Sequence, residues 1–247
     1  MYDLIKFEGR IQRLEIYDDS LSTFGKSGNT QIASSAILSG VTESVSLSAQ
    51  TVFLASQSRL HVQPVVMETD GKICIGKFHR ALIVENEYVI CVARRLEKNL
   101  YELYSILSPK TGLLYMQVGM GASVKKYKVS ATKGAKFLYA LTVVMMIGLF
   151  IYIDDYSIDN FINFGGVIIL FYFVIIFIMK RAVKSLKHFS EKSEEIFKIY
   201  GFENPTEIFL LSGRHYSDDY KILLESVYEY RKVIKKDPYP ENYIEQK

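Results

Sequence analysis

The sequence has few cysteines and nothing that resembles a secretory signal, and both absences narrow its functions. Cys74 and Cys91 are the only two cysteines among 247 residues, and both lie in apolar runs. No Cys-x-x-Cys pair or Cys/His cluster at ligand spacing occurs, so we expect two buried thiols rather than a metal site or a disulfide framework. Residues 1–7 include an acid and lack the basic start and apolar core of a signal peptide, so we expect the N-terminus to stay in the cytoplasm.

Signatures of catalysis and of nucleic-acid binding are also missing. The sequence contains no GxSxG or HExxH motif. GMGASVKK at 119–126 lacks the GxxxxGK[ST] spacing of a phosphate-binding loop, and we interpret it as a flexible connection. We therefore expect a protein that is not an enzyme and that has no cofactor. The formal net charge of +3 gives no reason to expect nucleic acid as a partner.

Two long segments carry no charged residue at all. They cover 137–153 and 161–179 and, at about 1.5 Å per helical residue, span about 25 and 29 Å, close to the hydrocarbon thickness of a bilayer. The sequence predicts a transmembrane hairpin over 136–180 with a short periplasmic loop at 154–160. Gly148, Gly165 and Gly166 would let the two helices approach closely.

Basic residues flank this hairpin, whereas its loop is acidic. The loop contains three aspartates and no base, and it is short enough to translocate. Because basic flanks stay inside, we predict a multi-pass protein of the bacterial inner membrane with both termini in the cytoplasm. Anionic membrane lipids are then expected partners. The flanking basic residues are Lys125, Lys126, Lys128, Lys133, Lys136, Lys180, Arg181, Lys184 and Lys187.

Residues 1–130 predict a β-rich cytoplasmic domain. Short apolar runs alternate with turn signals such as Asp70-Gly71, a pattern typical of a small antiparallel sheet or barrel. The segment 30–55 is rich in Ser and Ala and carries one acid, so it forms a loop, packed helices or a lipid contact. The predicted strand runs are 4–17, 60–67, 73–84, 88–96, 100–107 and 113–118.

Residues 181–247 predict a helical cytoplasmic region, which makes the whole an α+β membrane protein. The second span runs on as an amphipathic helix to Gly201, and a last helix begins near Asp218 or Asp219 and ends before Pro238. One face of that last helix forms an apolar seam, which packs internally or docks a partner chain or a second copy, the latter giving a homo-oligomer. The seam residues are Tyr220, Leu223, Val227, Tyr230 and Ile234.

Four strings follow one another along most of the chain, with the double span between the third and the fourth. They are IKFEGRIQRLEI (5–16), ASSAILSGVTES (33–44), LSPKTGLLYM (107–116) and SEEIFKIYGFENP (193–205). By these features the chain resembles a bacterial family classed as type VI secretion effector or immunity-factor-like proteins. The resemblance implies a role in interbacterial competition, as a toxin or as its neutralising protein, and it implies no active-site residues.

Three functions follow from these observations. The first is an inner-membrane immunity or accessory protein that binds a cognate effector at the cytoplasmic face or in the membrane, since seven periplasmic residues are too few for a standard interface. The second is a pore-forming effector that inserts the hairpin together with 30–55 and needs a chaperone as its partner. The third is a membrane-tethered scaffold or sensor.

Overall fold

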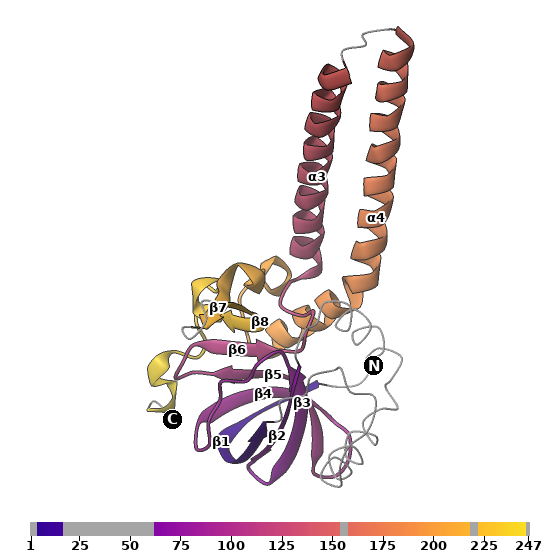
Figure 1. Cartoon of the computed structure of the whole chain (residues 1–247). Coiled ribbons are helices and arrows are strands. Elements are labelled where there is room, and N and C mark those ends of the chain that lie inside the picture. The colour runs from indigo at the N-terminus through magenta and orange to yellow at the C-terminus, as the bar shows by residue number, and fades with distance from the viewer. Residues whose placement is uncertain (1–3, 17–61, 154–157, 218–221, 246–247) are drawn as a thin grey trace.

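The computed structural model describes residues 4–16, 62–153, 158–217 and 222–245, which form a β-rich domain with a long helical hairpin projecting from it (Figure 1). Within these ranges, eight strands form one sheet. The segment 30–55 lies outside the described residues. The strands are β1 (Leu4–Ile16), β2 (Gln63–Thr69), β3 (Lys72–Phe78), β4 (Tyr88–Arg95), β5 (Leu100–Ser108), β6 (Leu113–Met116), β7 (Arg214–Ser217) and β8 (Ile222–Glu229). The helices are α3 (Val124–Ile153) and α4 (Ile158–Ile199), with short 3-10 turns η2 (Pro205–Glu207), η3 (Leu210–Gly213), η4 (Tyr230–Lys232) and η5 (Glu241–Ile244).

Strands β1 to β5 close into a barrel-like ring. The first half of β1 pairs with β4 and the second half pairs with β2, with a bulge between Ile11 and Arg13. The ring closes where β3 runs parallel to β5, with residues 73–75 beside 100–102. Turn chemistry sets the β2–β3 hairpin, because Asp70 and Gly71 both have positive φ. The predicted sheet or barrel is confirmed.

The interior of this ring is a continuous apolar core. Because side chains alternate along a strand, one face of each strand points inward, and Ile11, Met67 and Leu103 are almost completely buried there. Cys74 and Cys91 are free thiols buried in the same core, as the sequence predicted.

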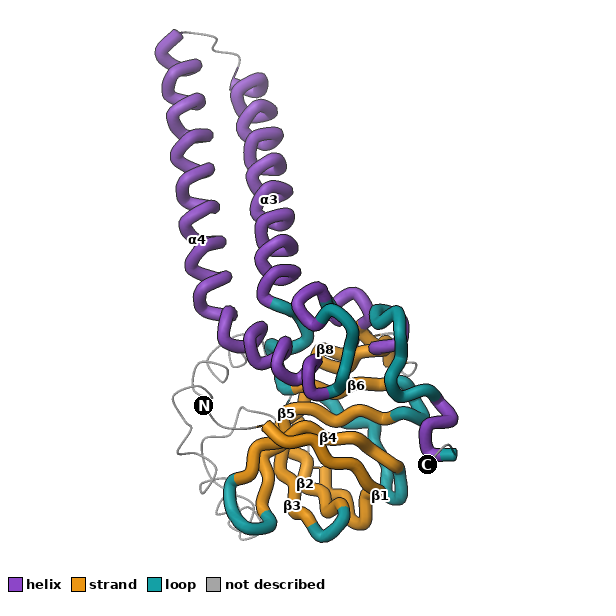
Figure 2. The backbone as a smooth tube through the Cα atoms, turned by 180° about the vertical axis from the view of Figure 1, so that it is seen from behind, coloured by secondary structure: helices purple, strands orange, loops and turns teal. Residues whose placement is uncertain are grey.

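The C-terminal region extends this sheet, and the prediction of a separate helical region over 181–247 is wrong beyond residue 199. Strand β8 pairs antiparallel with β6, and β7 pairs with β8 at the edge of the sheet. Residues before the hairpin and residues after it therefore share one domain. Figure 2 shows β8 beside β6 from the opposite side.

The predicted last helix is strand β8 followed by the turn η4. A bulge explains the error, because Arg214 pairs with Tyr228 whereas the next residue, His215, pairs with Leu224. The bulged segment includes Ser226, which has a φ of +63°. This irregularity breaks the two-residue alternation that marks a strand and leaves apolar spacings of three and four.

The predicted seam is accordingly not a docking stripe. Tyr220 lies outside the described residues, and Leu223 is half-buried on β8. Val227, Tyr230 and Ile234 are buried in the cores of the domain. They stabilise the domain from within.

Helix α4 continues from the hairpin into the domain, as predicted. Ile196 and Phe197 in its last turn, and Tyr200 just beyond its end, are buried against the outer face of the sheet in a second apolar core. The helix ends before Gly201, whose φ of +75° suits the left-handed C-terminal stop. The same helix thus belongs to both the hairpin and the domain.

Candidate functional site

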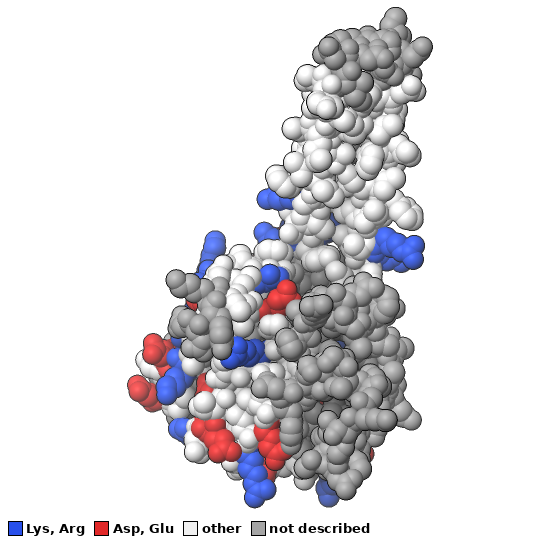
Figure 3. Space-filling model, viewed as in Figure 1, with Lys and Arg blue, Asp and Glu red and all other residues white. Residues whose placement is uncertain are grey.

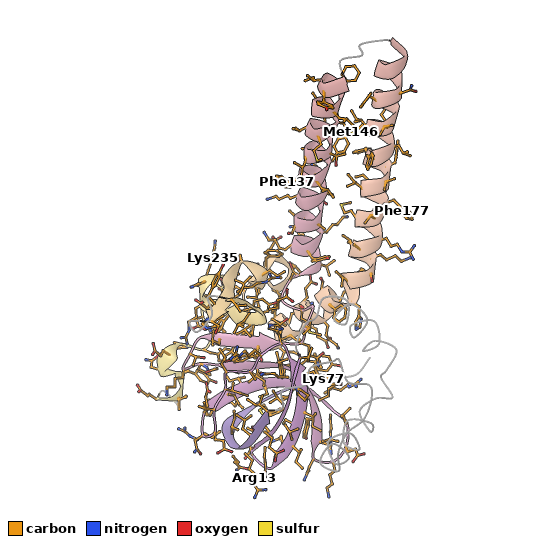
Figure 4. All side chains as sticks on the ribbon, viewed as in Figure 1. Arg13, Lys77, Phe137, Met146, Phe177 and Lys235 are labelled. Carbon is orange, nitrogen blue, oxygen red and sulfur yellow. The ribbon has the colours of Figure 1, made fainter. Side chains whose placement is uncertain are left out.

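The hairpin carries a large apolar surface that nothing in the described protein covers. Both helices are long and apolar enough to cross a membrane, and none of the most apolar stretch of either one is buried. Tyr152 is 86% exposed, and Phe137 and Phe177 lie on the outer sides of the two helices (Figure 4). A core helix of a soluble protein buries its apolar face, so this surface calls for apolar surroundings.

The hairpin is longer than its apolar part. At about 1.5 Å per residue, α3 is about 45 Å long and α4 about 63 Å, against a hydrocarbon thickness of about 30 Å. Along α4, about 16 Å separate Met179, the last residue of the apolar segment, from the buried Ser190. The domain therefore lies a short distance beyond the apolar segments.

Aromatic pairs hold α3 and α4 together. The rings of Tyr139 and Tyr172 pack edge to face with centroids 5.2 Å apart, and those of Phe150 and Phe164 do so at 5.0 Å. The three glycines of the hairpin do not lie where the two helices touch, contrary to the prediction. A Cβ atom added at Gly148, Gly165 or Gly166 would meet no described atom of the other helix within 4 Å, so these residues do not form a close helix crossing.

Basic side chains lie on both sides of the base of the hairpin, between its apolar part and the domain (Figure 3). We define the basic collar as the six exposed members of the predicted set for which no ion pair is found among the described residues. The basic collar consists of Lys128, Lys133, Lys136, Lys180, Arg181 and Lys184.

The other three predicted basic residues have protein partners. Lys125 and Lys126 both bind Glu207 of η2, the latter with a nitrogen–oxygen distance of 3.0 Å, and Lys187 lies 2.9 Å from Glu191. Hydrogen bonds from Lys125 and Lys126 lower the pKa of Glu207. Two of the nine residues thus tie the start of α3 to the domain.

Four lysines line a cleft between α3 and α4, just above the domain. Lys128 comes from α3, whereas Lys180, Lys184 and Lys187 lie on one face of α4 at spacings of four and three residues. The cleft has a volume of about 320 Å³. Its other lining residues are Val124, Tyr127, Val183 and Ser190.

The junction between hairpin and domain is rigid, which corrects the interpretation of 119–126 as a flexible connection. The Gly121 N–H donates to Ser193 Oγ at 3.1 Å, and the Val124 N–H donates to Glu194 Oε1 at 2.8 Å. Gly121 has a φ of +114°, and a Cβ there would lie 2.5 Å from the Tyr228 ring and hydroxyl. Glycine is required because only it allows this backbone to reach α4 and β8 together.

Tyr200 fixes the end of α4 on the sheet. Its hydroxyl lies 2.9 Å from Ser105 Oγ and donates to the Ile90 carbonyl at 3.2 Å. Burial raises the pKa of this phenol well above its ordinary value, so the group stays neutral and keeps both partners. The hairpin is thereby locked to β4 and β5.

The sequence predicted the basic residues around the hairpin, but it did not predict which of them line one cleft or which residues fix the hairpin to the domain. The spacing of Lys180, Lys184 and Lys187 is a local signal for one wall of the cleft. No local pattern joins that wall to Lys128, or pairs Glu194 with the start of α3. These pairings depend on how the two helices fold back on each other.

The described residues contain no group of three or more metal-ligating side chains. Comparison with known proteins gives no match, since no family model, curated protein or solved structure is similar to the chain. The function must therefore be argued from the two apolar helices, their basic collar and the domain that carries them.

Proposed function

We propose that this chain is a membrane-anchored binding protein whose hairpin crosses the bilayer twice and holds the β-rich domain at the cytoplasmic surface. One observation carries this proposal. Strand β6, before the hairpin, pairs with β8, after it, through Leu113–Glu229 and its neighbours. Both flanks of the hairpin must then lie on one side of any membrane that it crosses, which requires an even number of crossings.

The distribution of charged residues supports one side of the membrane for the domain. The basic collar favours the cytoplasmic face, where positive flanks are retained, and the acidic segment 154–160 at the tip of the hairpin is short enough to be translocated. In a bacterial cell, the proposed orientation puts the domain at the inner face of the inner membrane. The ends of α3 and α4 bring the domain within about 20 Å of the hydrocarbon edge.

The expected partner is another protein. The resemblance to type VI effector and immunity-factor-like proteins suggests a cognate effector toxin, which the domain would bind and neutralise. The neutralising interface would lie at the cytoplasmic face or within the bilayer, because the loop offers too few residues for a standard interface. In this proposal the protein acts by binding and does not catalyse a reaction.

Thiol labelling tests the topology directly. Burial raises the pKa of Cys74 to about 12 and that of Cys91 well above its ordinary value, so the native thiols provide a silent background. In intact spheroplasts, a membrane-impermeant maleimide should label Ser157→Cys in the loop. Lys235→Cys on the domain should react only after permeabilisation. The reverse pattern, or equal labelling of both variants, would overturn the proposed topology.

Expression tests the binding role. Harmless expression of the chain, together with rescue of cells from the product of a neighbouring toxin gene, supports an immunity protein. Growth arrest with loss of membrane potential on expression alone would instead make the chain a pore-forming effector.

A membrane-tethered scaffold or sensor is a second candidate, favoured by the continuity of α4. A single helix of 42 residues joins the hairpin to the buried Phe197 and Tyr200, so a movement of the hairpin moves the domain. For this candidate, the assembly state of the purified protein should change with lipid or ligand. An assembly state that stays constant across lipids would exclude it.

A further inference from the structure

The cleft at the base of the hairpin combines positive charge with apolar walls. Lys128 lines it from α3, and Lys180, Lys184 and Lys187 line it from α4. Val124, Tyr127 and Val183 supply apolar and aromatic surface. Such a lining suits an amphiphilic anion better than a simple ion, which would gain nothing from the apolar side chains.

The positive charge of the cleft is largely uncompensated. Among the described residues, Lys128, Lys180 and Lys184 form no ion pair, and Lys187 alone is paired, with the exposed Glu191. The other nearby acid, Glu194, accepts the Val124 N–H at 2.8 Å and so already has a partner in the protein. The cleft therefore has three cations available for an anionic ligand.

The level of the cleft places it at the membrane surface. Its upper lining residue, Lys180, directly follows Met179, the last residue of the apolar segment, and its lowest is the buried Ser190, about 15 Å further along α4. In the orientation proposed above, the mouth of the cleft lies at the depth of the lipid phosphates. Basic sites between membrane helices on the cytoplasmic side are where anionic headgroups bind.

We propose that this cleft binds the phosphate-bearing headgroup of one anionic phospholipid. The phosphate lies between Lys128, Lys180 and Lys184, and the glycerol portion lies against Tyr127 and Val183. This inference rests on the proposed membrane insertion and adds to it a single site with defined contacts. The site differs from diffuse attraction to the basic collar, because the bound lipid contacts both helices at once.

Lipid retention tests the site. The full chain is purified in a mild detergent, supplied with phosphatidylglycerol or with phosphatidylcholine, and examined by native mass spectrometry. One retained phosphatidylglycerol is expected, and no retained phosphatidylcholine. In Lys128→Gln/Lys184→Gln, affinity should fall by roughly 25-fold, at about fivefold for each lysine near the headgroup. Lys133→Gln/Lys136→Gln removes the same charge outside the cleft and should keep the retained lipid.

A variant with unchanged charge guards against misfolding of the lysine variant. Val183→Phe fills the cleft and should lose the retained lipid, while its melting temperature without lipid stays close to that of the wild type. Equal loss in the Lys128/Lys184 and Lys133/Lys136 variants would show diffuse attraction and overturn the site. Stabilisation by inorganic phosphate alone, at the same concentration as the lipid, would assign the cleft to a soluble phosphate compound and also overturn it.

Carbonate extraction distinguishes a failure of the proposed lipid site from a failure of the proposed membrane insertion. If the Lys128/Lys184 variant and the wild type both resist carbonate extraction from vesicles but retain lipid equally, the anchor stands and the cleft proposal fails. If the wild type itself is extracted by carbonate, the proposed function fails.

Discussion

Two charges placed in the middle of α4 give the sharpest test of the anchor. Ile169 and Phe173 lie one helical turn apart, near the centre of the apolar segment, and they are 59% and 64% exposed. The substitution Ile169→Lys/Phe173→Lys puts two ammonium groups where a membrane protein meets hydrocarbon. In a soluble protein the same two positions would meet water.

The expected free-energy changes differ between a membrane-inserted helix and an exposed helix of a soluble protein. The segment 161–179 contains fourteen Leu, Ile, Phe and Val residues. Twelve of them remain after the substitution and, at about 0.3 to 0.6 kcal/mol each at the helix centre, they favour insertion by at most about 4 to 7 kcal/mol. Two central lysines oppose insertion by about 5 to 7 kcal/mol, so the pair should abolish stable insertion of this helix, whereas one lysine would not. At an exposed position of a soluble protein, each change would alter stability by only about 0.5 kcal/mol.

Fractionation of cells measures the outcome. The wild type and the matched control Ile169→Leu/Phe173→Leu should pellet with membranes and resist carbonate at high pH. The double lysine variant should be degraded or aggregated, or be released by the wash. If the double lysine variant resists carbonate as firmly as the control, the inference that α4 lies in hydrocarbon is refuted.

Three further predictions concern the junction between hairpin and domain. Gly121→Ala should lower the melting temperature strongly, because the new methyl group would collide with Tyr228; a melting temperature equal to that of the wild type would contradict the rigid junction. Phe197→Ala should cost about 3 to 5 kcal/mol of unfolding free energy in detergent, since the side chain is fully buried; a loss below about 1 kcal/mol would mean that α4 does not pack on the sheet. Glu207 has a pKa below its ordinary value of 4.5, so its ion pair stabilises the folded state at neutral pH and is lost as the pH falls through the folded pKa. Glu207→Gln should therefore melt at a lower temperature than the wild type at pH 7, and this difference should disappear in strong acid; a difference that persists there would contradict the ion pair with Lys125 and Lys126.

Much of the barrel follows from local signals. Strands β1 to β6 were predicted because each is a short apolar run bounded by a turn signal, such as Asp70-Gly71 between β2 and β3. The continuation of α4 to Gly201 was also predictable, because its apolar residues recur at helical spacing and a glycine stops it. These features depend on residues within one turn or one hairpin of each other.

The C-terminal strands were missed because their pairing is not local. Strand β8 pairs with β6 across the whole hairpin, and Tyr228 Oη donates to the carbonyl of Met120, 108 positions earlier. The bulge at Ser226 removed the alternation by which a strand is recognised. Buried Val227 and Tyr230 therefore had the spacing of a helical seam, although they belong to the cores of the domain.

The sequence by itself determined that the chain carries two uncharged apolar segments with basic flanks, since length, hydropathy and charge are properties of consecutive residues. Only the tertiary structure decided that both flanks form a single domain, that Ser193 and Glu194 lock the hairpin to it, and that Lys128 lines the same cleft as the lysines of α4. The physical reason is that strand pairing and helix packing join residues far apart in the chain, and their geometry depends on the whole fold.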